Sequence, residues 1–141
     1  MTVREGGCLC GDVRFEVTGR PVVVGHCHCR DCQKTSGGGH VSFAFYLAEH
    51  ATVNGEPAAY DVPANAGGTT TRVFCPRCGS RLFARSSRRP GLLGIVLAAF
   101  DEPDDFTPSV SLYVSRRPPW DTLAEATTRF DEDIPPRQPE G

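Results

Sequence analysis

The sequence predicts an all-β fold built from short strands in antiparallel sheets. Seven or eight segments either alternate polar and apolar residues or are rich in β-branched and aromatic residues, and both patterns are typical of strands. The 15 glycines and 12 prolines supply turn formers between these segments. Very few stretches fit a helix, so we do not expect a helical or a mixed fold.

The first predicted elements are separated by glycine-containing turns. Residues 12–17 alternate polar and apolar side chains, as in a strand with one buried face, and the valines of 22–24 begin a second strand. A single helical turn over 31–35 is expected to stop at the glycine triplet 37–39. The aromatic run 41–47 predicts another strand.

The middle of the chain predicts further strands of the same kind. Asn54 and Gly55 are a tight-turn pair, so we expect a hairpin over residues 52–60. Residues 91–100 form the most apolar run and should be a central, buried strand. The remaining strands are expected at 69–74, 82–84 and 110–114.

The C-terminal part predicts less regular structure. We expect a short helix within residues 120–130 and a flexible, proline-rich tail over residues 134–141. A chain of 141 residues without an internal repeat or a linker is most economically a single domain. We place this domain at residues 1–133.

Charge and composition exclude several classes of partner. A formal net charge of −2 provides no basic field for nucleic acid or for an anionic membrane. No apolar run approaches the ~18 residues of a membrane span, and the first residues lack the apolar region of a signal peptide. We therefore expect a cytoplasmic protein whose thiols stay reduced. Its seven cysteines should then be metal ligands or redox groups rather than disulfides.

The stretch from Cys27 to Cys32 holds three cysteines and a histidine in six residues. Three thiolates with one open position are the ligand set of a catalytic zinc, which suits an incoming thiol or a small carbonyl. Cys27, Cys29 and Cys32 are therefore the predicted catalytic metal ligands, with His28 as the candidate base. Alternatively, His28 only faces solvent, or the site is closed by a fourth ligand from His26, His28 or His40.

Two further cysteine pairs flank this stretch. Cys8 and Cys10 lie in a glycine-bracketed turn, and Cys75 and Cys78 form a CxxC pair followed by Gly79. Four thiolates from two such turns make a closed tetrahedral zinc site, which leaves no position for a substrate and is therefore structural. The alternatives are a redox dithiol at Cys75 and Cys78, or buried free thiols.

Three stretches taken together resemble the glutathione-dependent formaldehyde-activating enzyme family, which also includes centromere protein V. They are Gly7–Val17, Cys27–Gly37 and Arg72–Ser80. Their three-part cysteine pattern is far more specific than a single CxxC pair, and the resemblance extends over roughly residues 5–133. Ser111 stands where the family tends to have a histidine, and residues 97–101 stand where it tends to have a glycine-leucine-aspartate element.

The resemblance implies a Mss4-like fold and a reaction. In that reaction glutathione, a small thiol, and formaldehyde, a small aldehyde, join to form S-hydroxymethylglutathione. An enzyme that catalyses this addition is a carbon–sulfur lyase acting in reverse. The centromere-associated relative keeps a second class open, a non-catalytic, zinc-stapled protein-binding module, and a thiol redox enzyme is a third. The resemblance also implies two zinc sites. The ligands of the structural zinc would be Cys8, Cys10, Cys75 and Cys78, and those of the catalytic zinc would be Cys27, Cys29 and Cys32.

Overall fold

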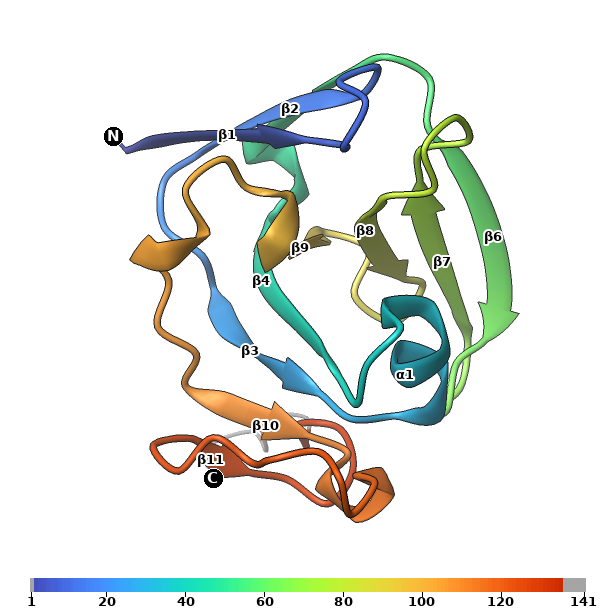
Figure 1. The fold of residues 1–141 in the computed structure, drawn as a ribbon, viewed down its shortest axis with the longest axis vertical. Helices are drawn as coiled ribbons and strands as arrows, with labels where there is room; N and C mark the ends of the chain where they lie inside the picture. The colour runs from blue at the N-terminus through green and yellow to red at the C-terminus, as the bar shows by residue number, and fades with distance from the viewer. Residues whose placement is uncertain (1, 136–141) are drawn as a thin grey trace, which may run out of the picture.

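The computed structural model describes residues 2–135 and arranges them in two β-sheets (Figure 1). The smaller, antiparallel sheet has three strands in the order β1-β2-β5. In β2 the side chains of Phe15 and Val17 are buried and that of Glu16 is exposed, as the alternating pattern predicts. The bounds are β1 Val3–Gly7, β2 Arg14–Thr18 and β5 Ala51–Asn54.

The larger sheet has eight strands in the order β11-β10-β3-β4-β9-β8-β7-β6. Its pairs are antiparallel from β3 to β6, whereas β10 runs parallel to both β3 and β11. The bounds are β3 Val23–Cys27, β4 Val41–Leu47, β6 Ala58–Pro63, β7 Thr69–Phe74, β8 Arg81–Ser86, β9 Leu92–Val96, β10 Val110–Leu112 and β11 Thr128–Arg129.

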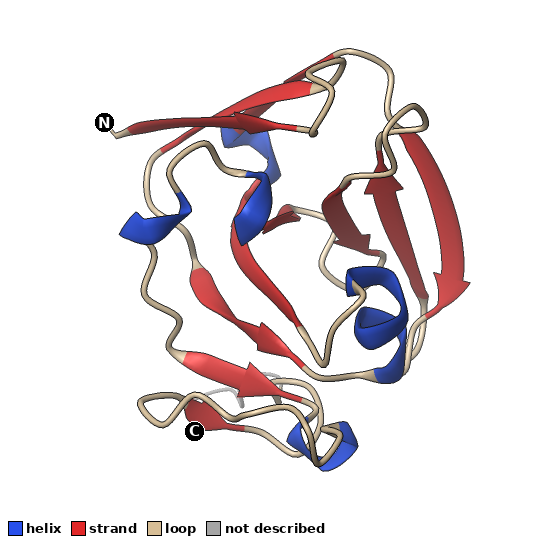
Figure 2. Ribbon diagram, viewed as in Figure 1, coloured by secondary structure: helices blue, strands red, loops and turns tan. Residues whose placement is uncertain are grey.

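Helices are short segments between the strands (Figure 2), so the all-β prediction is confirmed. The α-helix α1 spans Arg30–Ser36 and ends at Gly37, whose φ of 75° lies in the left-handed region that glycine adopts readily. This is the helical turn that the glycine triplet was expected to stop. The 3₁₀ helices are Ala48–His50, Leu97–Ala99, Pro103–Asp105 and Val114–Arg116.

Two groups of buried side chains form the core. The larger group lies between the two sheets, where Phe15 packs edge-on against Phe83 and Phe100 with ring centroids 5.4 Å and 5.2 Å away. The smaller group surrounds the predicted catalytic cysteines and consists of Cys29, Cys32, Val41, Phe43, Leu112 and Tyr113. The second core therefore positions the candidate site.

The predicted hairpin over residues 52–60 is wrong. Gly55 does turn, with φ of 101°, but β5 pairs with β2 of the small sheet and β6 pairs with β7 of the large one. A Cβ on Gly55 would lie 2.3 Å from the Asp12 carbonyl oxygen. Gly55 thus lets its own segment pack closely against the backbone at Asp12. The chain then crosses from the small sheet to the large one.

The helix predicted within residues 120–130 is also wrong. That segment consists of turns and bends that lead into β11. Its backbone N–H groups are used outside a helix, since Thr128 donates to the Ser109 carbonyl and Phe130 to the Ser111 carbonyl. Pairing with β10 therefore decides the conformation of this segment.

The ends of the described chain bear on two further expectations. Of the tail predicted at 134–141, residues 136–141 lie outside the described part, whereas the Ile134 carbonyl accepts a hydrogen bond from Arg89. No helix within residues 2–135 has the length and apolarity to cross a membrane.

Candidate functional site

The four flanking cysteines lie together although they come from the two different sheets. Their sulfurs all lie within 4.8 Å of one another. The Cys10 Sγ is 3.6 Å from that of Cys8 and 3.7 Å from that of Cys75. A tetrahedral zinc with Zn–S bonds of about 2.3 Å separates its sulfurs by roughly 3.8 Å. The donor set and its spacing therefore fit a tetrahedral zinc ion.

The turns around this site favour the thiolate form of some ligands. Hydrogen bonds from the Ser80 hydroxyl and backbone N–H lower the pKa of the Cys78 thiol to about 5. The Val13 backbone N–H donates to the Cys8 sulfur at 3.3 Å. Backbone and hydroxyl donors that point at sulfur are what a metal-bound thiolate requires.

The three clustered cysteines form a second group of sulfurs within 4.8 Å of one another. Cys27 is the last residue of β3, and Cys29 caps α1 because its sulfur accepts a hydrogen bond of 3.3 Å from the Cys32 N–H. Cys29 and Cys32 are both buried. One strand end and one helical turn thus bring three sulfurs to one side of the chain.

Two arginines balance the charge of this group. The Arg72 Nη1 lies 3.9 Å from the Cys32 sulfur, and the Arg72 side chain is only 11% exposed. Hydrogen bonds from Cys27 and Cys29, and then the charges of Arg81 and Arg72, hold the pKa of Cys32 well below its usual range. The Nε atoms of both arginines are buried without a partner among the described residues.

The three cysteines line a cavity of about 160 Å³. Apolar side chains of the second core form part of its wall, and Tyr113 lies among them. Tyr113 has a φ of 54°, the one non-glycine residue of the described chain with a positive φ. Such a conformation is uncommon and is often held at functional sites. The cationic wall of the cavity consists of Arg72, Arg81, Arg85, Arg88 and Arg89.

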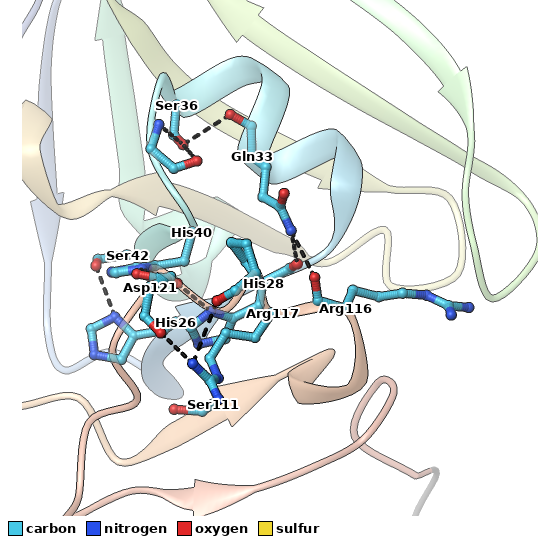
Figure 3. A network of polar contacts seen from close by, with 12 residues as sticks. His26, His28, Gln33, Ser36, His40, Ser42, Ser111, Arg116, Arg117 and Asp121 are labelled. Carbon is cyan, nitrogen blue, oxygen red and sulfur yellow. Dashed lines mark hydrogen bonds and ion pairs between the residues drawn. The ribbon is translucent and has the colours of Figure 1, made fainter.

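His28 lies on the other side of the chain from the sulfurs. It is not among the residues that line the cavity, and it is 1% exposed, so the solvent-facing alternative is wrong. Its Nδ1 lies 2.8 Å from the Asp121 carboxylate (Figure 3). Burial, only partly opposed by Asp121, lowers the pKa of His28. The expected role of His28 as a base beside the sulfurs therefore has no support in this geometry.

The other two histidines considered as a fourth ligand also lie apart from the sulfurs. The His26 Nδ1 is 2.8 Å from the Ser42 hydroxyl, and burial lowers the pKa of His26 to about 4. The His40 Nδ1 lies 3.0 Å from Asp121. The metal-ligating atoms thus fall into a four-sulfur group, a three-sulfur group and a histidine–aspartate group.

Sequence reasoning missed several residues of the site. Arg72 lies three residues before Cys75, and Arg81 lies three residues after Cys78. This placement beside the CxxC pair was the sequence signal that could have identified both arginines. No sequence signal identified Tyr113, because its place in the cavity wall depends on the pairing of β10 with β3. Ser111, noted for its departure from the family pattern, is fully buried, pairs with Thr127 and lies beside His26 in that ladder.

Comparisons with known proteins agree with this geometry. A family described as glutathione-dependent formaldehyde-activating enzyme matches residues 3–116. A Halomonas elongata protein, provisionally named a glutathione-dependent formaldehyde-activating enzyme, is 35% identical over 124 residues, which are 82% of this chain and 78% of that protein. A crystal structure of a Rhodobacter sphaeroides protein has a TM-score of 0.57 at 20% identity, with 74% of this chain and 91% of that one covered, and supports the fold alone.

The extent of the match is sufficient to assign the family. The matched segment contains all seven cysteines, and the resemblance noted in the sequence is confirmed. This chain belongs to the glutathione-dependent formaldehyde-activating enzyme family.

Proposed function

We propose that the cavity beside Cys27, Cys29 and Cys32 is where a small thiol and a small aldehyde are joined or separated, with zinc as the cofactor. One observation carries the proposal: all three cysteines line a cavity whose wall also bears five arginines. By family membership the thiol is glutathione and the aldehyde formaldehyde, so the protein acts as a carbon–sulfur lyase on S-hydroxymethylglutathione.

The donor set supports a metal ion with one position left for substrate. Zinc held by three thiolates supplies positive charge that lowers the pKa of an incoming thiol and polarises a carbonyl oxygen. Arg72 and Arg81 offset the negative charge of the sulfurs. The remaining cavity arginines offer partners for carboxylates, which glutathione carries at both ends. They are Arg85 and Arg88, whereas Arg89 already pairs with the Asp133 carboxylate at 3.6 Å.

The reaction needs no oxidant. The thiol sulfur adds to the carbonyl carbon, the carbonyl electron pair moves to oxygen, and that oxygen takes up the proton which the thiol released. Tyr113 lines the cavity and packs with Cys29 and Cys32, so its hydroxyl, in place of His28, is the candidate group that gives a proton to this oxygen and regains the one released by the thiol. Apolar neighbours such as Phe43 keep water away from this exchange.

We assign a structural role to the zinc site of Cys8, Cys10, Cys75 and Cys78. The Cys75 side chain is fully buried and its sulfur lies against that of Cys10, which gives the redox alternative at Cys75 and Cys78 no support. None of the seven cysteines is in a disulfide, which suits a reducing compartment such as the cytoplasm.

Cys29→Ser tests the catalytic site. We expect the variant to lose one zinc equivalent and at least ~100-fold in the enzyme-catalysed exchange between formaldehyde and S-hydroxymethylglutathione, because a ligand of the reacting site is gone. Exchange spectroscopy by NMR measures the rate, and elemental analysis measures zinc. Ser115→Ala, an exposed change outside the cavity, is the control and should leave both unchanged. A folded Cys29→Ser variant with undiminished exchange would refute the proposal.

A further inference from the structure

A third cluster of metal-ligating atoms lies outside both cysteine sites. Two imidazoles and one carboxylate converge there (Figure 3). The Nδ1 of His28 lies 2.8 Å from the Oδ2 of Asp121, and the Nδ1 of His40 lies 3.0 Å from both carboxylate oxygens. The three ligating groups lie within 4.8 Å of one another. The proposed reaction does not use this cluster.

Three separate segments of the chain build the cluster. His28 precedes α1, His40 precedes β4, and Asp121 follows the 3₁₀ helix Val114–Arg116. A Cβ on Gly39 would lie 2.3 Å from the carboxyl carbon of Asp121, so the backbone beside His40 is fitted closely around this side chain. The His28 side chain is 1% exposed and the Asp121 side chain 10%, which makes the cluster part of the interior.

The Asp121 carboxylate is negatively charged and has no cationic side chain as its fixed partner. Within residues 2–135 it pairs with the two histidines alone and with no arginine or lysine. Arg117 is close, but its guanidinium donates to the backbone carbonyls of Pro118 and Asp121 and leaves the carboxylate free. A buried carboxylate is costly unless a compensating charge or several donors face it.

We propose that His28, His40 and Asp121 bind a divalent transition-metal ion such as Zn²⁺, at a site distinct from both cysteine sites. Two imidazoles and one carboxylate are a ligand set that zinc and its neighbours in the first transition row accept. The Nδ1 atoms of both histidines face the same carboxylate, so the three ligating groups are directed at one place.

The ion also has a route to the site. The His40 side chain is 30% exposed and lines a cleft of about 710 Å³ that is separate from the cavity of the three cysteines. Three protein ligands leave a coordination position that can face this cleft. His28 and Asp121 do not line the cleft, so His40 is the ligand that connects the site to it. The third site is therefore reached from this cleft and not from the cavity of Cys27, Cys29 and Cys32.

Cobalt titration of the purified protein, loaded with two equivalents of zinc for the two cysteine sites alone, tests the proposal. Cobalt bound by nitrogen and oxygen gives weak visible bands, whereas cobalt bound by cysteine adds intense sulfur-to-metal charge-transfer bands. We expect one equivalent of Co²⁺ to bind with the weak bands alone. Asp121→Asn and His40→Gln should each weaken this binding by at least about 100-fold, since loss of even an outer partner of a metal site costs 10–100-fold.

The controls separate this site from the cysteine sites and from misfolding. Glu125→Gln removes an exposed carboxylate of the same loop and should bind cobalt like the wild type. If Asp121→Asn fails to fold, the partly exposed His40→Gln variant decides the outcome. The proposal is overturned if no Co²⁺ binds, if binding brings sulfur charge-transfer bands, or if a folded His40→Gln variant keeps wild-type affinity.

Discussion

The hydroxyl group of Tyr46 is a buried polar group of the larger core that we expect to lower the stability of the fold. The Tyr46 side chain is fully buried in β4, and its hydroxyl has no hydrogen-bond partner among the described residues. An unsatisfied buried polar group costs about 1–3 kcal/mol. Burial also raises the pKa of the Tyr46 phenol, an effect that the nearby Arg4 guanidinium opposes in part although it makes no hydrogen bond of good geometry to the hydroxyl.

Tyr46→Phe should therefore stabilise the protein. We expect the free energy of unfolding to rise by about 1 kcal/mol at neutral pH, because the ring stays and only the unsatisfied hydroxyl goes. The folded phenol ionises at higher pH than the unfolded one, so the wild type should lose stability as pH rises above ~10, and the variant should lose less. Urea unfolding at pH 7 and pH 10.5 checks both points. A less stable variant at pH 7 would indicate a missing partner for the hydroxyl.

The chemistry of single residues allowed the two cysteine sites to be predicted from the sequence, but it gave no indication that Asp121 belongs to a site. Seven thiols at short spacings have few uses in a reducing compartment, so sequence alone grouped them as four and three. Asp121 is separated from His28 by 93 residues and from His40 by 81. Isolated carboxylates are common in any sequence, and only the folded chain brings this one between two imidazoles.

Among the elements, α1 has the clearest dependence on a single residue. The helix carries Cys32 and starts at Cys29, and its end requires the positive φ of Gly37. Gly37→Ala should destabilise the protein by about 1–2 kcal/mol, the cost of placing a Cβ in the left-handed region. No atom lies within 4 Å of that Cβ, so backbone strain is the whole effect.

Gly38→Ala is the matched control for this prediction. Gly38 has no positive φ, and an added Cβ would meet only the Ser36 hydroxyl at 3.9 Å. Thermal unfolding of the two variants should show a lower Tm for Gly37→Ala alone. Equal effects of both substitutions would mean that the helix end does not depend on the left-handed conformation.

The elements that sequence predicted well are those decided by their own residues. Residues 41–47 and 69–74 were predicted as strands and form β4 and β7 with these bounds, because their β-branched and aromatic residues suit a sheet wherever it lies. The hairpin over residues 52–60 failed because Asn54 and Gly55 specify a turn without specifying the strand partners. Pairing partners are set by the rest of the fold.

At the scale of the whole molecule, the four-sulfur site joins the two sheets. Cys8 and Cys10 follow β1 of the small sheet, and Cys75 and Cys78 lie between β7 and β8 of the large one. Val96 packs against both core groups as well. On these grounds we propose that residues 1–133 act as one domain.

Cys78→Ser should therefore destabilise the entire fold. Structural zinc contributes about 10–16 kcal/mol in zinc-finger peptides, and the loss of even ~3 kcal/mol lowers the Tm of a chain this size by roughly 10 °C. We expect a matching loss of one zinc equivalent. Calorimetry with elemental analysis measures both, and Cys29→Ser, which should change Tm far less, is the comparison. A soluble Cys78→Ser variant with the wild-type Tm would contradict the structural assignment.

The tripeptide Cys27-His28-Cys29 presents its side chains alternately to two sides of the chain. Its sulfurs line the reaction cavity, and its imidazole joins the histidine–aspartate cluster behind. Insertion or deletion of one residue here would exchange the two sides and dismantle both clusters at once. Natural drift and protein engineering thus face the same restriction: the spacing of this tripeptide is constrained by the clusters on both sides of the chain.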